Sequence, residues 1–187
     1  MRINRLLSIF MVACLAFSAM AGVHVLNNDE VMNNNTKTLV AYFSATGTTM
    51  EAATRLAEVA GADLHEIVPE RLYTAADLNW NDKSSRSSVE MADKSSRPAI
   101  ANRVENMAQY DTVFVGFPIW WYIAPTIINT FLEQYNLEGK TVIPFFTSGG
   151  SGKGETMKYL TPSAPKANWK EPLNLNRKSE SEIKEML

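Results

Sequence analysis

Residues 37–51, KTLVAYFSATGTTME, place an apolar run, a loop of small polar residues and the start of a helix in immediate succession. The run at 39–43 is apolar at every position, which is typical of a parallel strand covered by helices on both faces. The helix expected from about Met50 directs its free N–H groups, and the positive end of its dipole, at the loop. The stretch therefore predicts a loop that binds an anion such as phosphate.

The loop between strand and helix offers hydroxyl and backbone N–H donors but no lysine or arginine. It consists of Ser44, Ala45, Thr46, Gly47, Thr48 and Thr49. We expect it to suit a phosphate bound by neutral donors, because the polyphosphate and metal of a Walker loop require a Gly-Lys pair. An ordinary strand-to-helix turn, with Ser or Thr as the N-cap residue, accounts for the same pattern without a ligand.

The chain has 187 residues, 45% of them hydrophobic and 20% charged. This length suits one domain with a hydrophobic core, which we place at residues 37–187. A formal net charge of −2 gives no reason to expect nucleic acid as a partner. The sequence also predicts no metal site.

The first residues are expected to be a targeting signal and not part of the fold. Residues 1–21 combine a short basic start, an apolar run and small residues at Ala19 and Ala21, which is typical of a cleaved export signal. An uncleaved anchor is the alternative. Cys14 is the only cysteine, and the residues before it are a poor match to a lipoprotein processing site; if used, that site would tether the protein to a membrane. Residues 22–36 are polar and aperiodic, which predicts a flexible leader. The export signal at 1–21 predicts a periplasmic protein.

The remaining apolar patterns predict alternating helices and strands. In chain order they are a helix over 50–60, a strand over 63–68, a helix over 100–110, a strand over 113–117, a helix over 124–135, a strand over 141–146, a short helix over 157–160, an edge strand over 169–175 and a capped helix from Ser179. Residues 70–98, hereafter the excursion, are rich in Ser, Asp, Lys and Arg and carry Tyr73, Leu78 and Trp80 as apolar anchors. Such a long segment is either a solvated surface loop or a lid over a site.

Aromatic residues follow the strand at 113–117. Pro118 ends this strand because it cannot donate to a ladder, and Ile119, Trp120, Trp121 and Tyr122 come next. The carboxyl end of a parallel strand is where ligands bind in open α/β sheets, and an indole ring offers a large face for stacking. Core tryptophans are the alternative; adjacent residues in a loop rarely both bury, which favours contact with a ligand.

A third loop of small residues follows the strand at 141–146. It consists of Thr147, Ser148, Gly149, Gly150, Ser151 and Gly152. Glycines allow the backbone to approach a ligand closely, so the loop can donate N–H groups to the polar edge of a ring. A flexible turn is the alternative.

The alternation predicts a doubly wound α/β fold with a five-stranded parallel sheet in three layers. The motifs SATGTT, GFPIWW and FFTSGGSG, each after a strand, together resemble the flavodoxin family of FMN-binding proteins, especially its exported bacterial branch. The resemblance covers residues 37–187 and implies the strand order 2-1-3-4-5. It also implies that the loop at 44–49 holds the FMN phosphate, and that the loops at 118–122 and 147–152 flank the isoalloxazine ring.

The resemblance leaves two kinds of flavin chemistry open. Relatives are either one-electron carriers or reductases that pass a hydride from a nicotinamide to a quinone or similar acceptor. Carriers turn a peptide in the second loop, and that loop has no glycine after Gly116, which favours two-electron chemistry. No histidine or cysteine stands near the motifs, and Tyr122 is a weak proton donor candidate, so no catalytic residue is predicted.

The expected partner is a redox protein or a small-molecule acceptor such as a quinone, since NAD(P)H is scarce outside the cytoplasm. A non-enzymatic FMN-binding module uses the same loops without turnover. A hydrolase is disfavoured because Ser44 and Thr46 have no nearby base.

Overall fold

The structure, a computed structural model, describes residues 37–187. The predicted signal peptide at 1–21, with Cys14, and the predicted leader at 22–36 lie outside the described residues. Within the described part of the chain, no helix combines the length and apolar character needed to cross a membrane.

The described residues form a parallel sheet with the strand order β2-β1-β3-β4-β5, as predicted. Its strands are β1 (Lys37–Tyr42), β2 (Asp63–Glu66), β3 (Tyr110–Pro118), β4 (Thr141–Thr147), β5 (Asn168–Trp169) and β6 (Leu173–Asn174). The edge strand expected at 169–175 is present but interrupted: β5 and β6 are two short pieces that pair separately with β4. Pro172 lies between them and has no N–H to continue the ladder.

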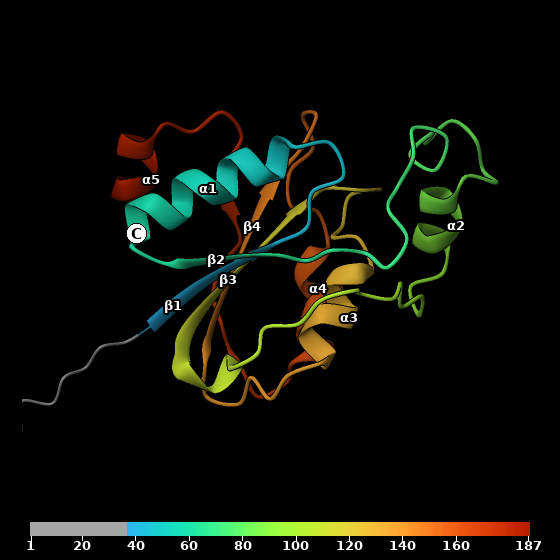
Figure 1. The fold of residues 1–187 in the computed structure, drawn as a ribbon. Coiled ribbons are helices and arrows are strands. Elements are labelled where there is room, and N and C mark those ends of the chain that lie inside the picture. The colour runs from blue at the N-terminus through green and yellow to red at the C-terminus, as the bar shows by residue number, and fades with distance from the viewer. Residues whose placement is uncertain (1–36) are drawn as a thin grey trace, which may run out of the picture. The chain divides into compact units, whose positions relative to one another are not determined.

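Helices cover both faces of the sheet and complete the three predicted layers (Figure 1). Helices α1 (Thr48–Ala60) and α5 (Glu180–Met186) lie on one face, and α3 (Ile127–Glu133) and α4 (Thr156–Leu160) lie on the other. The strand β1 is buried on both faces as predicted: Val40 packs in the core beneath α1, whereas Leu39 and Ala41 pack in the core beneath α3. This doubly wound arrangement brings the carboxyl ends of β1, β3 and β4 together.

The ends of α1 and α5 follow from local sequence. Gly61 ends α1 in a left-handed conformation with φ 59°, and its N–H bonds the last turn. Ser179 and Glu182 form the capping box that begins α5, with each side chain bonded to the other residue's backbone N–H. Both features were expected from the sequence.

The helix predicted over 100–110 is absent from the described structure, where only a short 3-10 turn, η1 (Met107–Gln109), forms. Ile100 pairs in a bridge with Pro69, and Asn102 bonds the backbone of Glu66 and Val68. Ile100 and Val104 still pack on the core, which explains their helix-like spacing. The segment bonds to residues 66–70, at and just after the end of β2. These bonds hold its backbone extended instead of helical.

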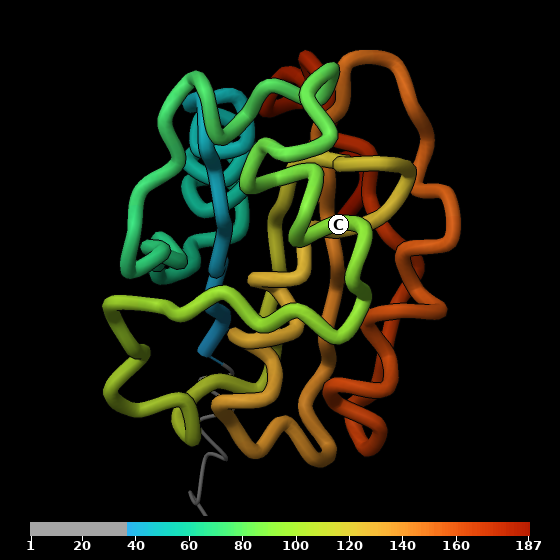
Figure 2. Tube along the Cα trace, turned by 90° about the vertical axis from the view of Figure 1, so that its right-hand side faces the viewer, coloured from blue at the N-terminus to red at the C-terminus, as the bar shows by residue number. Residues whose placement is uncertain are grey.

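The excursion contains one short helix, α2 (Arg86–Ala92), capped by Ser85. Figure 1 shows α2 set apart from the helices that cover the sheet, beyond the carboxyl ends of the strands. In Figure 2 the excursion, drawn in green, passes in front of the sheet as seen from that side. It therefore borders the region where the three predicted site loops meet.

Candidate functional site

The loops after β1, β3 and β4 enclose two adjoining cavities of about 290 and 450 Å³. The two cavities share a wall made by Ala45, Thr46, Pro118, Ile119 and Trp120. Thus the loops that the sequence separates by about 100 residues form one continuous site. Its combined volume falls within the range typical of small-molecule sites, roughly 300–1,000 Å³.

The smaller cavity lies at the N-terminus of α1 and is lined further by Thr48, Thr49, Thr147, Ser148 and Gly149. The N-cap residue is Gly47, with φ 91°, and no side chain caps the helix. The alternative interpretation, a ligand-free turn capped by Ser or Thr, is therefore wrong. Because glycine supplies no capping oxygen, the N–H groups of the first turn are left without a side-chain partner and favour an anion.

Hydroxyl groups add further donors around this cavity. The backbone N–H of Gly47 donates to Ser44 Oγ over 3.1 Å, so the Ser44 hydroxyl keeps its own proton for another partner. Thr49 Oγ1 and Thr147 Oγ1 lie 2.8 Å apart, and only one of their two protons is used between them. Among residues 37–187, none that lines either cavity carries a charge. The cradle is thus built from neutral donors, as predicted.

The aromatic loop after β3 is a two-residue hairpin. Trp120 and Ile123 exchange backbone hydrogen bonds of 2.9 and 3.1 Å, and Trp121 and Tyr122 adopt φ values of 45° and 65°. This is the geometry of a type I′ turn, which usually requires Asn or Gly. Large side chains in this conformation are strained, and such strain is characteristic of functional sites.

Gly154, beyond the glycine loop, supports this hairpin. A Cβ atom at Gly154 would lie 2.0 Å from the carbonyl oxygen of Tyr122, and Gly154 itself has φ 51°. Only glycine fits here. The contact fixes the backbone of Tyr122 from the side of β4 and α4.

The two tryptophans have different environments. Trp120 is half-buried, with its ring centroid 5.6 Å from that of Phe43 and 5.3 Å from that of Tyr73, both edge-to-face. Trp121 is 41% exposed and borders the larger cavity. The expectation that the neighbours do not both bury is confirmed, and Trp121 is the one left with free surface for a ligand.

Tyr73 anchors the excursion to Trp120. Its hydroxyl donates to Glu90 over 2.5 Å, Glu90 accepts from Arg86 over 2.6 Å, and the Arg86 guanidinium lies 3.9 Å from the centre of the Tyr73 ring. Burial, aided by the bond to Glu90, raises the pKa of Tyr73 far above its usual value, so the phenol stays neutral. The excursion is therefore packed against the site and is not merely a solvated loop.

Most residues predicted from the sequence line a cavity. They are Ala45, Thr46, Thr48, Thr49, Pro118, Ile119, Trp120, Trp121, Tyr122, Thr147, Ser148, Gly149 and Ser151. Four others, Ser44, Gly47, Gly150 and Gly152, belong to the same loops but line neither cavity.

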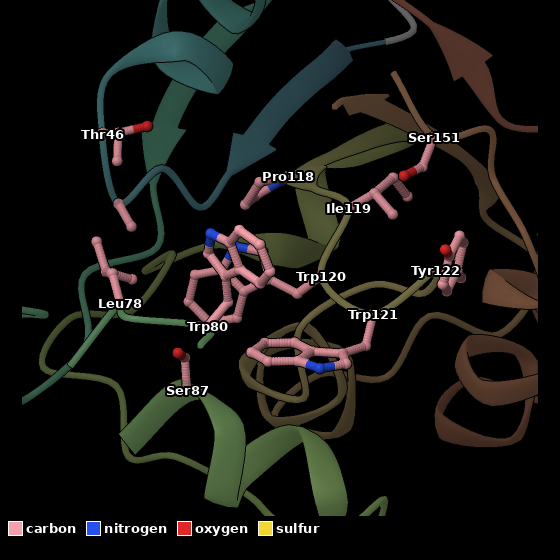
Figure 3. Close-up of a pocket in the computed structure, with 11 residues that line it drawn as sticks. Thr46, Leu78, Trp80, Ser87, Pro118, Ile119, Trp120, Trp121, Tyr122 and Ser151 are labelled. Atoms are coloured by element: carbon pink, nitrogen blue, oxygen red, sulfur yellow. The ribbon is translucent and has the colours of Figure 1, made fainter. Parts of the chain in front are cut away.

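The sequence prediction missed three lining residues from the excursion, Leu78, Trp80 and Ser87 (Figure 3). Leu78 and Trp80 stand out in the sequence as apolar residues in a polar segment, and this pattern could have indicated that they pack against the site. Ser87 carries no such signal because the segment contains many serines.

Comparisons with known proteins agree with this geometry. A family model described as flavodoxin matches residues 37–187. A crystal structure of a protein from Bacteroides eggerthii assigned to the flavoproteins shares 56% identity, with a TM-score of 0.79; the match covers 82% of this chain and 96% of that one. A corresponding protein from Bacteroides uniformis shares 52% identity with a TM-score of 0.78, over 81% and 97% of the two chains.

A flavoprotein from Lactobacillus acidophilus, crystallised in complex with FMN, is 26% identical with a TM-score of 0.62, over 75% of this chain and 93% of that one. Among proteins with curated functions, none matches. The match to the family model spans every described residue, and it agrees with the strand order and the three loops. The chain therefore belongs to the flavodoxin family.

Proposed function

We propose that this protein binds FMN across the two adjoining cavities and acts as a redox protein. The observation that carries the proposal is the uncapped N-terminus of α1, whose cavity shares a wall with a cavity rich in aromatic residues. An anion cradle joined to an aromatic slot fits a molecule with a phosphate at one end and a flat ring at the other. Family membership and the FMN complex of the Lactobacillus acidophilus relative support FMN as the cofactor.

Different residues of this chain would bind the phosphate and the ring of FMN. The N–H groups at the start of α1, with the hydroxyls of Thr46, Thr48 and Thr49, would hold the phosphate. Trp121 and the backbone of the loop at 147–152 would border the ring. When bound, FMN supplies reversible redox chemistry, and the protein governs access and electrostatics.

We infer two-electron reduction of a small acceptor as the activity. The support is the fixed hairpin: two backbone hydrogen bonds join Trp120 to Ile123, and Gly154 packs against the Tyr122 carbonyl. A backbone held in this way resists the peptide rotation by which one-electron carriers adjust to their redox state. Among the described residues that line the cavities, Tyr122 is the only ionisable one, so protons are expected to come from solvent.

Electron transfer to a protein partner is the second candidate. Trp121 and Tyr122 are 41% and 70% exposed beside the larger cavity, which is the kind of surface a redox partner can cover. A module that only stores FMN uses the same residues and is distinguished by its failure to react with any donor or acceptor.

Stepwise anaerobic reduction of the FMN-loaded protein tests this function. We expect the flavin absorption bands to bleach in one phase with constant isosbestic points, and quinones to restore them. A long-wavelength band at one electron per flavin would favour the carrier instead. Protein that leaves the FMN spectrum and fluorescence unchanged would refute FMN binding.

We also propose that the protein acts outside the cytoplasm. The support is the pattern of residues 1–21 in the sequence alone. The mass of the protein from the periplasmic fraction of a Gram-negative host tests the proposal. Loss of residues 1–21 is expected, whereas a lipid-modified Cys14 would indicate a membrane tether and an intact, cytoplasmic chain would contradict export.

A further inference from the structure

We propose that Leu78, Trp80 and Ser87 of the excursion, together with Trp121, form a subsite for a neutral, planar carbonyl compound such as a quinone. In this subsite the Ser87 hydroxyl donates a hydrogen bond to the carbonyl, and the indole of Trp80 stacks on the ring. The inference rests on the proposed function, because the subsite adjoins the part of the cavity assigned to the flavin.

The division of the lining residues between the two cavities locates this subsite. The shared wall and the phosphate cradle come from the three loops after β1, β3 and β4. Three further residues, Leu78, Trp80 and Ser87, line only the larger cavity. They belong to the excursion and not to any of those three loops. The excursion thus forms one wall of the larger cavity and takes no part in the proposed phosphate cradle.

Ser87 is the observation that points to a ligand. Its side chain is almost completely buried, at 2% exposure, and among the described residues its Oγ has no hydrogen-bond partner. Figure 3 shows this hydroxyl projecting from α2 toward the side chains of Leu78 and Trp80. Buried hydroxyls are normally bonded, so one that faces a cavity without a partner is suited to bind a ligand there.

The position of Ser87 is fixed by its surroundings. Its backbone N–H donates to the Asp77 carbonyl over 3.0 Å, and Asp77 in turn accepts from Thr74. One residue earlier, Arg86 forms the partly buried ion pair with Glu90, and Glu90 also accepts the hydrogen bond from Tyr73. The hydroxyl therefore belongs to a segment that is already fixed by packing. A ligand can bind it without a large entropy cost for ordering that segment.

The chemistry of the lining narrows the ligand class. Among residues 37–187, none that lines the larger cavity is charged, and Thr48 and Thr49 at the start of α1 line only the smaller cavity, so the larger cavity favours a neutral compound over an anion or a dinucleotide. Trp80 and Trp121 are 71% and 41% exposed, which leaves indole surface for a flat ring. A carbonyl oxygen accepts from a serine hydroxyl, which completes the match to a quinone.

Equilibrium dialysis of the full chain against 1,4-naphthoquinone tests the subsite, both with and without FMN. Naphthalene lacks the carbonyls, and 1,4-naphthoquinone-2-sulfonate adds a charge. We expect Ser87→Ala to weaken naphthoquinone binding by about fivefold to tenfold, the effect of one lost hydrogen bond. The same variant should bind naphthalene as the wild type does, and the sulfonate should bind more weakly than the neutral quinone.

Trp80→Ala should weaken binding of naphthoquinone and naphthalene alike by about tenfold, and Trp80→Phe should restore most of it. Ser96→Ala is the matched control, because Ser96 lies in the excursion but does not line the cavity. FMN affinity is measured separately and should stay within about twofold of wild type in Ser87→Ala, both Trp80 variants and Ser96→Ala. Loss of even one hydrogen bond to FMN would change the affinity by more than about twofold.

Two results would overturn the inference. Naphthoquinone binding that is absent from the wild type, or unchanged in Ser87→Ala and Trp80→Ala, would remove the subsite. A loss of FMN affinity in these variants would assign Ser87 or Trp80 to the flavin instead. Wild-type protein that binds naphthoquinone through Ser87 but fails to bind FMN would contradict the proposed function and leave the subsite standing.

Discussion

The side-chain oxygens of Thr49 and Thr147 form a buried hydrogen bond of 2.8 Å across 98 positions of sequence. Thr49 lies in the first turn of α1, and Thr147 is the last residue of β4. This one bond joins the phosphate cradle to the start of the glycine loop. The spacing of the two loops that border the smaller cavity is therefore set by a direct contact between them.

Removing one partner of this bond should destabilise the protein. We expect Thr147→Val to lower the free energy of unfolding by about 1–3 kcal/mol, because the Thr49 hydroxyl stays buried without a partner. Thr49→Val should have a similar effect, and the double variant should cost less than the sum of the two. Urea unfolding of the FMN-free protein measures all three, and strictly additive losses would show that the hydroxyls do not interact.

Gly154 should be far more sensitive to substitution than Gly139. Both have positive φ, 51° and 75°, so alanine at either position incurs backbone strain of about 1–2 kcal/mol. At Gly154 the added Cβ also meets the Tyr122 carbonyl, whereas at Gly139 nothing lies within 4 Å. Gly154→Ala should therefore lose additional stability and weaken FMN binding. Equal losses of stability with unchanged FMN affinity would contradict the role of Gly154 in holding the hairpin.

The tryptophan pair should separate stability from binding. Trp120→Ala should lower the free energy of unfolding by about 2–4 kcal/mol, because Trp120 packs against Phe43 and Tyr73. Trp121→Ala should change it by no more than about 0.5 kcal/mol, as expected for an exposed residue, yet should weaken FMN binding. Urea unfolding and fluorescence titration give the two quantities. A Trp121→Ala variant with wild-type FMN affinity would remove Trp121 from the flavin site.

The free energy of unfolding should fall as the pH drops below 6.5, the ordinary pKa of histidine. His65 stacks near Phe131, its Nε2 is buried without a partner among the described residues, and burial lowers its pKa below the ordinary 6.5. Between the folded-state pKa and 6.5 the unfolded chain binds more protons, so stability is lost as pH falls through this window. Urea unfolding between pH 5 and 8 should show this slope in wild type and in His24→Gln, but not in His65→Gln. A slope that persists in His65→Gln would assign it to other groups.

Much of the fold follows from local sequence because its causes are local. The apolar run at 39–43, Gly61 after α1 and the Ser179–Glu182 capping box each determine a feature through neighbouring residues. The segment at 100–110 behaves differently. Its apolar spacing resembles a helix, but its hydrogen-bond partners are residues 66–70, at and just after the end of β2, and the Tyr135 hydroxyl, and no local pattern contains them.

The candidate site shows the same division. Polar and aromatic loops after three strands predict where the site lies, since parallel strands present their carboxyl ends together. The hairpin at Trp121 and Tyr122 is not predictable, because large residues rarely adopt positive φ and the supporting contact comes from Gly154, some 30 positions away. Ser87 is likewise indistinguishable in sequence from its neighbours Ser85 and Ser88, and only tertiary packing places it in the cavity.

Parallel titrations of the FMN-free protein with FMN and with riboflavin test the central claim most directly. The two ligands share the ring and differ by the phosphate, which the uncapped N-terminus of α1 and the neighbouring hydroxyls are proposed to bind. We expect riboflavin to bind about 100-fold more weakly than FMN, or more weakly still, because several charge-assisted hydrogen bonds are lost. Equal affinities for the two, or no binding of FMN, would contradict the account.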